Sequence, residues 1–388
     1  MSYLHGISVT EISGTSRSLR TIATAVIGLV VTAPAADAAV FPLNRPVLIT
    51  NIEGAVLKAG NTGTMKNALD AIADQVRAPV VVVRVAPGVD ATATNLAVIG
   101  TDVNGQKTGM QALLAAEAIV GVRPRIIGAP GLDTQPVATQ LAAVAKRLRA
   151  MAYAAAIGAN RDAVIAYRSN FTARELMLIY PDFTTPVGVL GDSEPSFAVA
   201  RALGLRALID QEQGWHKTLS NVPVKNVTGL TKDVQFDLQD PDSDSNLLNA
   251  ADITTIVRLN GELRFWGSHT CSDNPDFMFE SATRTAQIIA DTIVVGLVWA
   301  VDKPLLPSLA RDIVEQINAA FRKLQTAGQI LGGEAWFDTA KNPAGSLKLG
   351  KLLLSYKYTP VPPLEQLGLE QEITDEYLAD FGQLVANA

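Results

Sequence analysis

Residues that commonly carry catalysis, disulfides and zinc sites are scarce in this sequence. The 388 residues include one cysteine and three histidines. A single cysteine cannot form a disulfide within the chain, and Cys and His are too few to favour a zinc site. The shortage of histidine also removes most groups that exchange protons near neutral pH. We therefore expect no metal site and little acid–base chemistry.

Charge is also low, and its balance is not basic. Charged residues make up 18% of the sequence, apolar residues 48%, and the formal net charge is −6. A protein that binds nucleic acid is expected to present a basic surface, so this class is disfavoured. The mean hydropathy of +0.20 is high for a chain that stays soluble alone. It predicts apolar surface that partner subunits cover.

Hydrophobic runs long enough to cross a bilayer are missing. Residues 286–301 are interrupted by Gln287, Asp291 and Thr292, and they fall short of the ~20 residues that a membrane helix needs. Residues 17–38 resemble a signal peptide, but they follow a segment that already has the pattern of a strand. We expect neither membrane insertion nor secretion.

What the sequence does have is a regular alternation of apolar and amphipathic segments over residues 42–210. Predicted strands include PVLIT, VVVVRV, RIIG, AYAAA and ELMLIY, and predicted helices such as MKNALDAIADQVR and VATQLAAVAKRLRAM lie between them. We expect a further weak strand at NLAVIG, residues 95–100. Apolar strands separated by amphipathic helices are typical of a parallel sheet covered on both faces.

The remainder of the chain has a different pattern. A stretch rich in turn formers follows residue 210, and two long helices are predicted over residues 281–301 and 308–326. Ser308 and Gly328 have the residue types of an N-terminal and a C-terminal cap for the second helix. Because 388 residues exceed one ordinary core, two or three domains are expected.

One polar turn resembles a nucleotide-binding loop without matching it. Residues 100–108, GTDVNGQKT, lead into a predicted helix. A P-loop places its lysine directly after the second glycine, whereas Gln106 separates Gly105 from Lys107 here. The insertion moves the ammonium group away from the phosphate cradle. An α/β enzyme that binds a nucleotide at this turn is the alternative function.

A second polar turn resembles a calcium loop. Asp240, Asp242 and Asp244 alternate along it, but Ser245 and Ala251 stand where an EF-hand needs glycine and glutamate. We interpret it as a solvated acidic turn.

The single cysteine, Cys271, lies two residues after His269 and two before Asp273. A cysteine nucleophile needs a base that a third group orients, and an oxyanion hole nearby. A cysteine and a histidine two apart on one strand have neither. We expect Cys271 to be a packed thiol beside a hydrogen-bonded histidine.

The segment around this cysteine has four parts in a fixed order. They are Leu248 and Asn249, an isoleucine-rich strand at residues 253–257, the turn glycine Gly261, and the end WGSHT. This order resembles a signature of contractile tail sheath proteins of myophages and R-type bacteriocins. The stretches TAVIGLVVTAP and AFRKLQTAGQILGGEAWFD resemble the same family. The resemblance covers most of the chain.

The resemblance implies an α/β chain in which an α+β inner domain carries an inserted doubly wound parallel-sheet outer domain, plus extended terminal strand arms. The expected divisions are an N-terminal arm at 1–20, an inner domain at 21–41 and 211–362, an outer domain at 42–210, and a C-terminal arm at 363–388.

The family resemblance also implies a structural function. Such chains polymerise as stacked hexameric rings around a tail tube and contract without nucleotide hydrolysis, cofactor or metal, driving the tube through the target cell envelope. The implied partners are other copies of the chain, the tail tube protein, and the baseplate and tail terminator proteins, with no nucleic acid and no membrane insertion by the sheath itself. The implied location is a virion tail or a bacteriocin particle, assembled in the host bacterial cytoplasm.

In this family the terminal arms add strands to the sheets of neighbouring subunits. The corresponding residues here are Ile7, Val9, Glu11 and Ile12 in the N-terminal arm, and Leu367, Leu369, Gln371 and Ile373 in the C-terminal arm. Ordinary edge strands within one subunit are the alternative for these arms.

The tube contact is expected on the exposed face of the helix at residues 308–326. Leu309, Ile313, Ile317, Phe321 and Leu324 form its apolar stripe, which leaves Arg311, Arg322 and Lys323 exposed. A solvated helix face is an equal alternative for these cations. A monomeric binding module is the third function class that the sequence leaves open.

Overall fold

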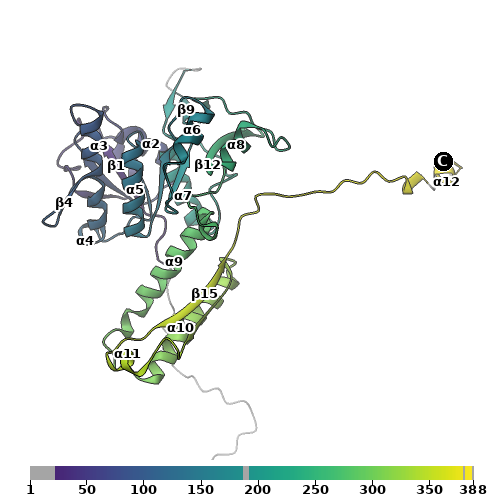
Figure 1. Cartoon of the computed structure of the whole chain (residues 1–388). Helices are drawn as coiled ribbons and strands as arrows, with labels where there is room; N and C mark the ends of the chain where they lie inside the picture. Colours follow the sequence, from purple (N-terminus) through teal and green to yellow (C-terminus); the bar gives the residue numbers. More distant parts are fainter. Residues whose placement is uncertain (1–21, 187–191, 379–380, 387–388) are drawn as a thin grey trace, which may run out of the picture.

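The larger part of the molecule is built on one eight-stranded, largely parallel sheet (Figure 1). The computed structural model describes residues 22–186, 192–378 and 381–386. The strand order is β13-β12-β8-β7-β6-β1-β3-β2, and only the two edge strands, β2 and β13, run antiparallel to their neighbours. The strands are β1 (Ile27–Thr32), β2 (Pro46–Ile49), β3 (Val80–Val85), β6 (Ile126–Gly128), β7 (Met151–Ala155), β8 (Leu176–Ile179), β12 (Ile253–Leu259) and β13 (Glu262–Trp266).

Helices cover both faces of this sheet, as the apolar strands require. Every residue of β3 is buried, so neither face of that strand meets water. One core cluster joins the sheet to α2 and α7, and a second joins it to α3, η1 and α5. The helices are α1 (Ile52–Val56), α2 (Met65–Ala73), α3 (Ala91–Ile99), η1 (Gly109–Ala115), α4 (Ala116–Val120), α5 (Gln135–Leu148), α6 (Arg161–Arg168), α7 (Ala198–Glu212), α8 (Asp244–Ala250) and η2 (Pro275–Phe277).

Shorter strands lie beside the main sheet. They form a hairpin and a small three-stranded sheet, and they are β4 (Asp102–Val103), β5 (Gln106–Lys107), β9 (Phe183–Pro186), β10 (Ser193–Ser196) and β11 (Gly229–Leu230).

Most of the predicted strand-and-helix series within residues 42–210 is confirmed. The segment NLAVIG was predicted to be a strand, but most of it belongs to helix α3. The Asp90 side chain caps this helix by accepting from the Ala93 amide. Of its nine residues only Val98 is buried, so α3 has no amphipathic stripe that the sequence would show.

The sheet also differs from the predicted division of the chain. That division placed residues 21–41 and 211–362 in a domain separate from residues 42–210. In the structure β1 pairs with both β3 and β6 at the centre of the sheet, and β12 continues it beyond β8. All six residues of β1 are buried, because a central strand is covered on both faces. A strand distant in sequence therefore completes the core.

The smaller part of the molecule is a helix pair packed on a two-stranded hairpin (Figure 1). Its elements are α9 (Glu280–Leu297), η3 (Val298–Ala300), α10 (Pro307–Thr326), β14 (Ile330–Phe337), α11 (Ala344–Lys348) and β15 (Leu354–Pro360). Helix α10 begins at Pro307 with Leu306 as its N-cap, so the prediction that Ser308 caps the helix is wrong. Proline at the first helical position has no amide to leave unpaired. Gly328, with φ of +69°, follows the C-cap Ala327.

Helix α9 connects the two parts. Its first half is buried against the large sheet, where Tyr153 bonds to Glu280 and Arg284 pairs with Asp210. Farther along, the buried Asp291 pairs with Arg125 and Arg149. The last turns leave the sheet and pack against the hairpin side, where Ile293 and Leu297 contact the third core cluster. Buried ion pairs thus fix one end of the helix to the sheet.

The C-terminal segment runs away from the body of the molecule (Figure 1). Residues 361–375 form neither helix nor strand, and they precede the short helices η4 (Glu376–Leu378) and α12 (Phe381–Ala386). The predicted N-terminal arm, with Ile7, Val9, Glu11 and Ile12, lies outside the described residues.

Candidate functional site

Cys271 is a buried structural thiol. Its side chain is fully buried, and its amide donates to the Leu176 carbonyl at 2.8 Å. Burial raises the pKa of the thiol to about 12, so the nucleophilic thiolate is absent at neutral pH. Strand β13 ends at Trp266, before His269 and Cys271, so the two are not partners on one strand. The prediction of a packed thiol is confirmed.

His269 contacts two carboxylates instead. Its Nδ1 lies 2.8 Å from Asp252 Oδ1, and its Nε2 lies 3.0 Å from Glu365 Oε2. Burial lowers the pKa of the imidazole, but hydrogen bonds to Asp252 and Glu365 outweigh it and raise that pKa to about 9. The Ser268 hydroxyl also donates to Glu365 Oε1 at 3.1 Å. A protonated histidine thus fastens the start of the C-terminal segment to the sheet.

The turn at residues 100–108 is a hairpin. Strands β4 and β5 pair across it, and Asn104 and Gly105 form its tip with φ of 51° and 81°. Lys107 Nζ lies 3.0 Å from Asp102 Oδ2, so its charge is already paired. A phosphate cradle needs backbone amides converging at the start of a helix, and this turn does not place the lysine there. The geometry does not support the nucleotide-binding alternative.

Hydrogen bonds and an ion pair of its aspartates stabilise the acidic turn near residue 240. Asp240 Oδ1 accepts from the Asp242 amide at 2.9 Å, and Asp244 opens α8 and pairs with Arg161 at 2.8 Å. Within the described residues no group of three or more His, Cys, Asp or Glu side chains is placed to hold a metal. Among those residues, too, no helix is long and apolar enough to cross a membrane.

The hairpin β14–β15 offers open strand edges. Its register runs from Ile330 opposite Pro360 to Phe337 opposite Leu354, and the sheet has two strands in the part of the chain that the structure describes. One side packs on α10 through Phe321. Two-stranded sheets are marginal alone, and a strand edge can pair with a further strand. On the β14 side the Asn318 side chain already pairs with the amide and the carbonyl of Ala335, so β15 offers the freer edge. The hairpin is therefore a ready acceptor for an additional strand.

Helix α10 presents its predicted faces. Ile313, Ile317, Phe321 and Leu324 are buried, which confirms the apolar stripe, with Leu309 partly buried at its start. Arg311, Arg322 and Lys323 are all exposed, as predicted. Arg322 Nη2 lies 2.5 Å from Glu315 Oε1, so the charge of Arg322 is partly satisfied within the helix.

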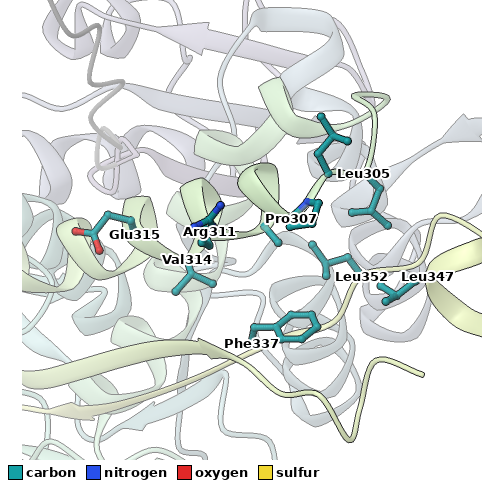
Figure 2. Close-up of a pocket in the computed structure, with 10 residues that line it drawn as sticks. Leu305, Pro307, Arg311, Val314, Glu315, Phe337, Leu347 and Leu352 are labelled. Atoms are coloured by element: carbon teal, nitrogen blue, oxygen red, sulfur yellow. The ribbon is translucent and has the colours of Figure 1, made fainter. Parts of the chain in front are cut away.

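An apolar groove opens beside the first turns of α10 (Figure 2). Its volume is about 770 Å³. Phe337 of β14 and Leu352 point toward Pro307 and Val314 of the helix (Figure 2). Leu306 and Phe337 at its border are 57% and 40% exposed, so the groove is open to solvent. The lining residues are Leu305, Leu306, Pro307, Ala310, Arg311, Val314, Glu315, Phe337, Leu347 and Leu352.

The predicted C-terminal strand residues lie free of the body. Leu367, Leu369 and Ile373 are 69%, 84% and 93% exposed, and Gln371 is exposed between the last two. Apolar side chains this exposed are unusual unless a partner covers them.

Comparison with known proteins decides the family. The chain is 53% identical over 387 residues to the tail sheath protein of Escherichia phage P2, covering 98% of both chains. The chain belongs to the phage tail sheath protein family. This sheath protein is also 48% identical to the major tail sheath protein of Serratia phage KSP20, over 97% of this chain and 96% of that one. It is a structural component of a contractile phage tail, and not an enzyme.

Three family descriptions match successive segments of the sheath protein. Residues 24–85 match the tail sheath protein Gp18 domain III N-terminal region, residues 105–271 the phage tail sheath protein central domain, and residues 272–374 the phage tail sheath C-terminal domain. The fold matches the helical sheath of the anti-feeding prophage in its contracted state, with a TM-score of 0.70 at 16% identity, over 96% of this chain and 99% of that one. The sheath fold is thereby shown.

Two features of this sheath protein escaped prediction. Glu365 is 96 residues from His269, and no local pattern links them. The groove is lined by three separate segments, residues 305–315, Phe337 and residues 347–352, so no periodic pattern in the sequence predicts it. The only indication of the groove in the sequence is the dipeptide Leu305–Leu306 before Pro307, because two adjacent leucines in a loop are unfavourable when exposed to solvent.

Proposed function

We propose that this sheath protein polymerises as stacked hexameric rings around a tail tube, with terminal arms exchanged between copies. Assembled sheath then contracts through stored conformational energy, without nucleotide hydrolysis, and drives the tube through a target envelope. A baseplate would anchor one end and a terminator the other. The anti-feeding prophage structures, one of a baseplate and one of a helical sheath in its contracted state, support this context.

The observation that carries the proposal is the C-terminal arm. Its residues 367–373 are extended, exposed and apolar at alternate positions, and the arm projects away from the rest of the chain (Figure 1). Alternation at period two is the pattern of a strand with one face to bury. An arm with that pattern and no strand partner in the described part of its own chain is suited to a sheet in another copy.

The hairpin β14–β15 is the proposed acceptor. A strand added to its edge would form main-chain hydrogen bonds, each contributing about 1 kcal/mol net. Five or six such bonds per arm, repeated around a ring, would link copies strongly while the larger parts rotate. We propose that residues 7–12 and 367–373 are the donor strands.

The domain assignment follows from this acceptor. We propose that the inner part, next to the tube, consists of α9, α10 and the hairpin, while the large sheet forms the outer part. The tube contact is proposed on α10 at Arg311, Arg322 and Lys323, which are exposed on that helix.

The arm is tested through its backbone. Gln371→Pro removes one amide donor and blocks strand pairing, whereas Gln371→Ala keeps the amide and removes only the side chain. We expect the proline variant to remain a folded monomer and to form no tubes in negative-stain microscopy, while the alanine variant forms normal tubes. Normal tubes from the proline variant would count against strand exchange.

A further inference from the structure

The apolar groove and the C-terminal end of the chain have complementary chemistry. We propose that the groove beside α10 binds the acidic C-terminal end of a second copy, including helix α12. The inference rests on the proposed polymer, and it adds a second, side-chain-based contact to the strand exchange described above.

The C-terminal end carries anchors of the correct spacing. Phe381 and Val385 are four residues apart in α12, which places them on one face of that helix, and Leu378 of η4 precedes them in the sequence. Phe381 and Val385 are each 62% exposed and Leu378 is 67% exposed, so their own chain does not cover them. A helix that docks in a groove uses anchors at this spacing. The volume of about 770 Å³ is within the range of established binding pockets.

Charge favours this pairing. Residues 361–388 contain no basic residue, and they contain the acidic residues Glu365, Glu370, Glu372, Asp375, Glu376 and Asp380. Arg311 lines the groove, and the exposed Lys348 and Lys351 follow and precede the lining residues Leu347 and Leu352. The one acidic lining residue, Glu315, is paired with Arg322. An acidic segment therefore meets a border that is basic on balance.

The C-terminal end that fills the groove comes from another copy, because each chain leaves its own hairpin at the end opposite to the groove. Strand β15 ends at Pro360, opposite Ile330, while the groove lies at the other end of the hairpin, next to Phe337. Beyond Pro360 the link from Glu365 to Ser268 and His269 directs the chain away from that groove. Figure 1 shows the segment continuing outward from the body.

The contact is continuous with the proposed strand exchange. Phe337, opposite Leu354 of β15, and Leu352, just before β15, both line the groove, so a strand laid along β15 of another copy can continue into the groove. Between Ile373 and η4, Thr374 and Asp375 belong to neither helix nor strand, so the chain can turn from the added strand toward the groove there.

Site-directed crosslinking tests the occupant in full-length chains. Phe381→Cys and Leu347→Cys are made in separate copies, mixed, assembled and treated with a short bis-maleimide. The native Cys271 is buried and its pKa is raised to about 12, so it does not compete. We expect a product of twice the chain mass. Leu57→Cys, at a residue 86% exposed on the large domain, replaces Leu347→Cys in the control and should give no product.

The possible outcomes distinguish a failure of the groove contact from a failure of the proposed polymer. Tubes without the crosslink overturn the docking and leave the sheath function intact. A crosslink within one chain of a double variant, without gain in mass, overturns the second copy as the occupant. Absence of tubes from the unaltered chain counts against the proposed function.

A second variant measures the strength of the contact. Phe381→Asp should raise the protein concentration needed for tube formation by about tenfold or more, because a buried aromatic anchor is replaced by a charge. Leu57→Asp is the matched control and should leave that concentration unchanged. Equal behaviour of the two variants would overturn the proposal.

Discussion

At the scale of residues, the segment around His269 and Cys271 joins parts of the chain and does not form a nucleophilic site. His269 bridges Asp252 and Glu365, and Arg168 holds Asp252 from the other side at 2.9 Å. Neither partner was predictable, because Asp252 and Glu365 lie 17 and 96 residues from the histidine. The burial of Cys271 was predictable, since a lone thiol without an oriented base is usually a packing residue.

The link at His269 should depend on pH. Its pKa is raised from 6.5 to about 9 in the folded chain, so its contribution to stability is complete below pH 6.5 and is lost as pH rises through 9. We expect His269→Gln to lower the free energy of unfolding by on the order of 2 kcal/mol at pH 6, after discounting for the half-exposed Glu365. Near pH 10 the two proteins should unfold alike.

Denaturant unfolding of the unassembled protein at a series of pH values measures this difference. Comparing the variant with the unaltered protein cancels the titration of all other groups. A difference that stays constant from pH 6 to pH 10 would show that the histidine only fills space.

At the scale of elements, amphipathic segments were predictable and long-range pairings were not. Helices α2 and α5 and strands β3 and β7 follow from local patterns of apolar residues. Helix α3 lacks such a pattern, and the central place of β1 depends on partners 50 to 100 residues away. The stripe on α10 was predictable, whereas its groove, which needs Phe337 and Leu352 beside it, was not.

Two neighbouring glycines in β14 provide a test of the packing between hairpin and helix. A Cβ on Gly333 would lie 2.8 Å from Cγ of the buried Phe321, whereas a Cβ on Gly332 would meet nothing within 4 Å. We expect Gly333→Ala to destabilise the fold by about 1–3 kcal/mol through overpacking. Gly332→Ala is the matched control and should have little effect. Thermal unfolding measures both, and equal shifts in Tm would contradict this account of the packing.

At the scale of the whole molecule, the chain combines a large sheet part, a smaller hairpin part and an extended, acidic C-terminal end. The large sheet and the hairpin part have separate cores, and α9 joins them. The family and the α/β character were predictable because they depend on patterns spread over the whole chain. The division into parts was less so, because the sheet recruits β1, β12 and β13 from outside the central segment.

Truncation at the N-terminus tests the other proposed arm. Removing residues 1–14 should abolish ordered tubes and leave a monomer with unchanged circular dichroism, because these residues are proposed to donate a strand to another copy. Removing residues 376–388 should instead leave short or fragile tubes, since strand exchange is retained and only the groove contact is lost. Negative-stain microscopy distinguishes the two, and normal tubes from the first truncation would refute exchange by that arm.

Helix α9 limits how the two parts of the molecule can move relative to each other. Its 18 residues span about 27 Å, and buried ion pairs of Asp210, Glu280 and Asp291 clamp one end within the large part. Beyond Asp291, the last of these ion pairs, the helix continues for only six residues, or about 9 Å, to Leu297. A rotation of the hairpin part relative to the large sheet must therefore either bend α9 within its last turns or break buried ion pairs.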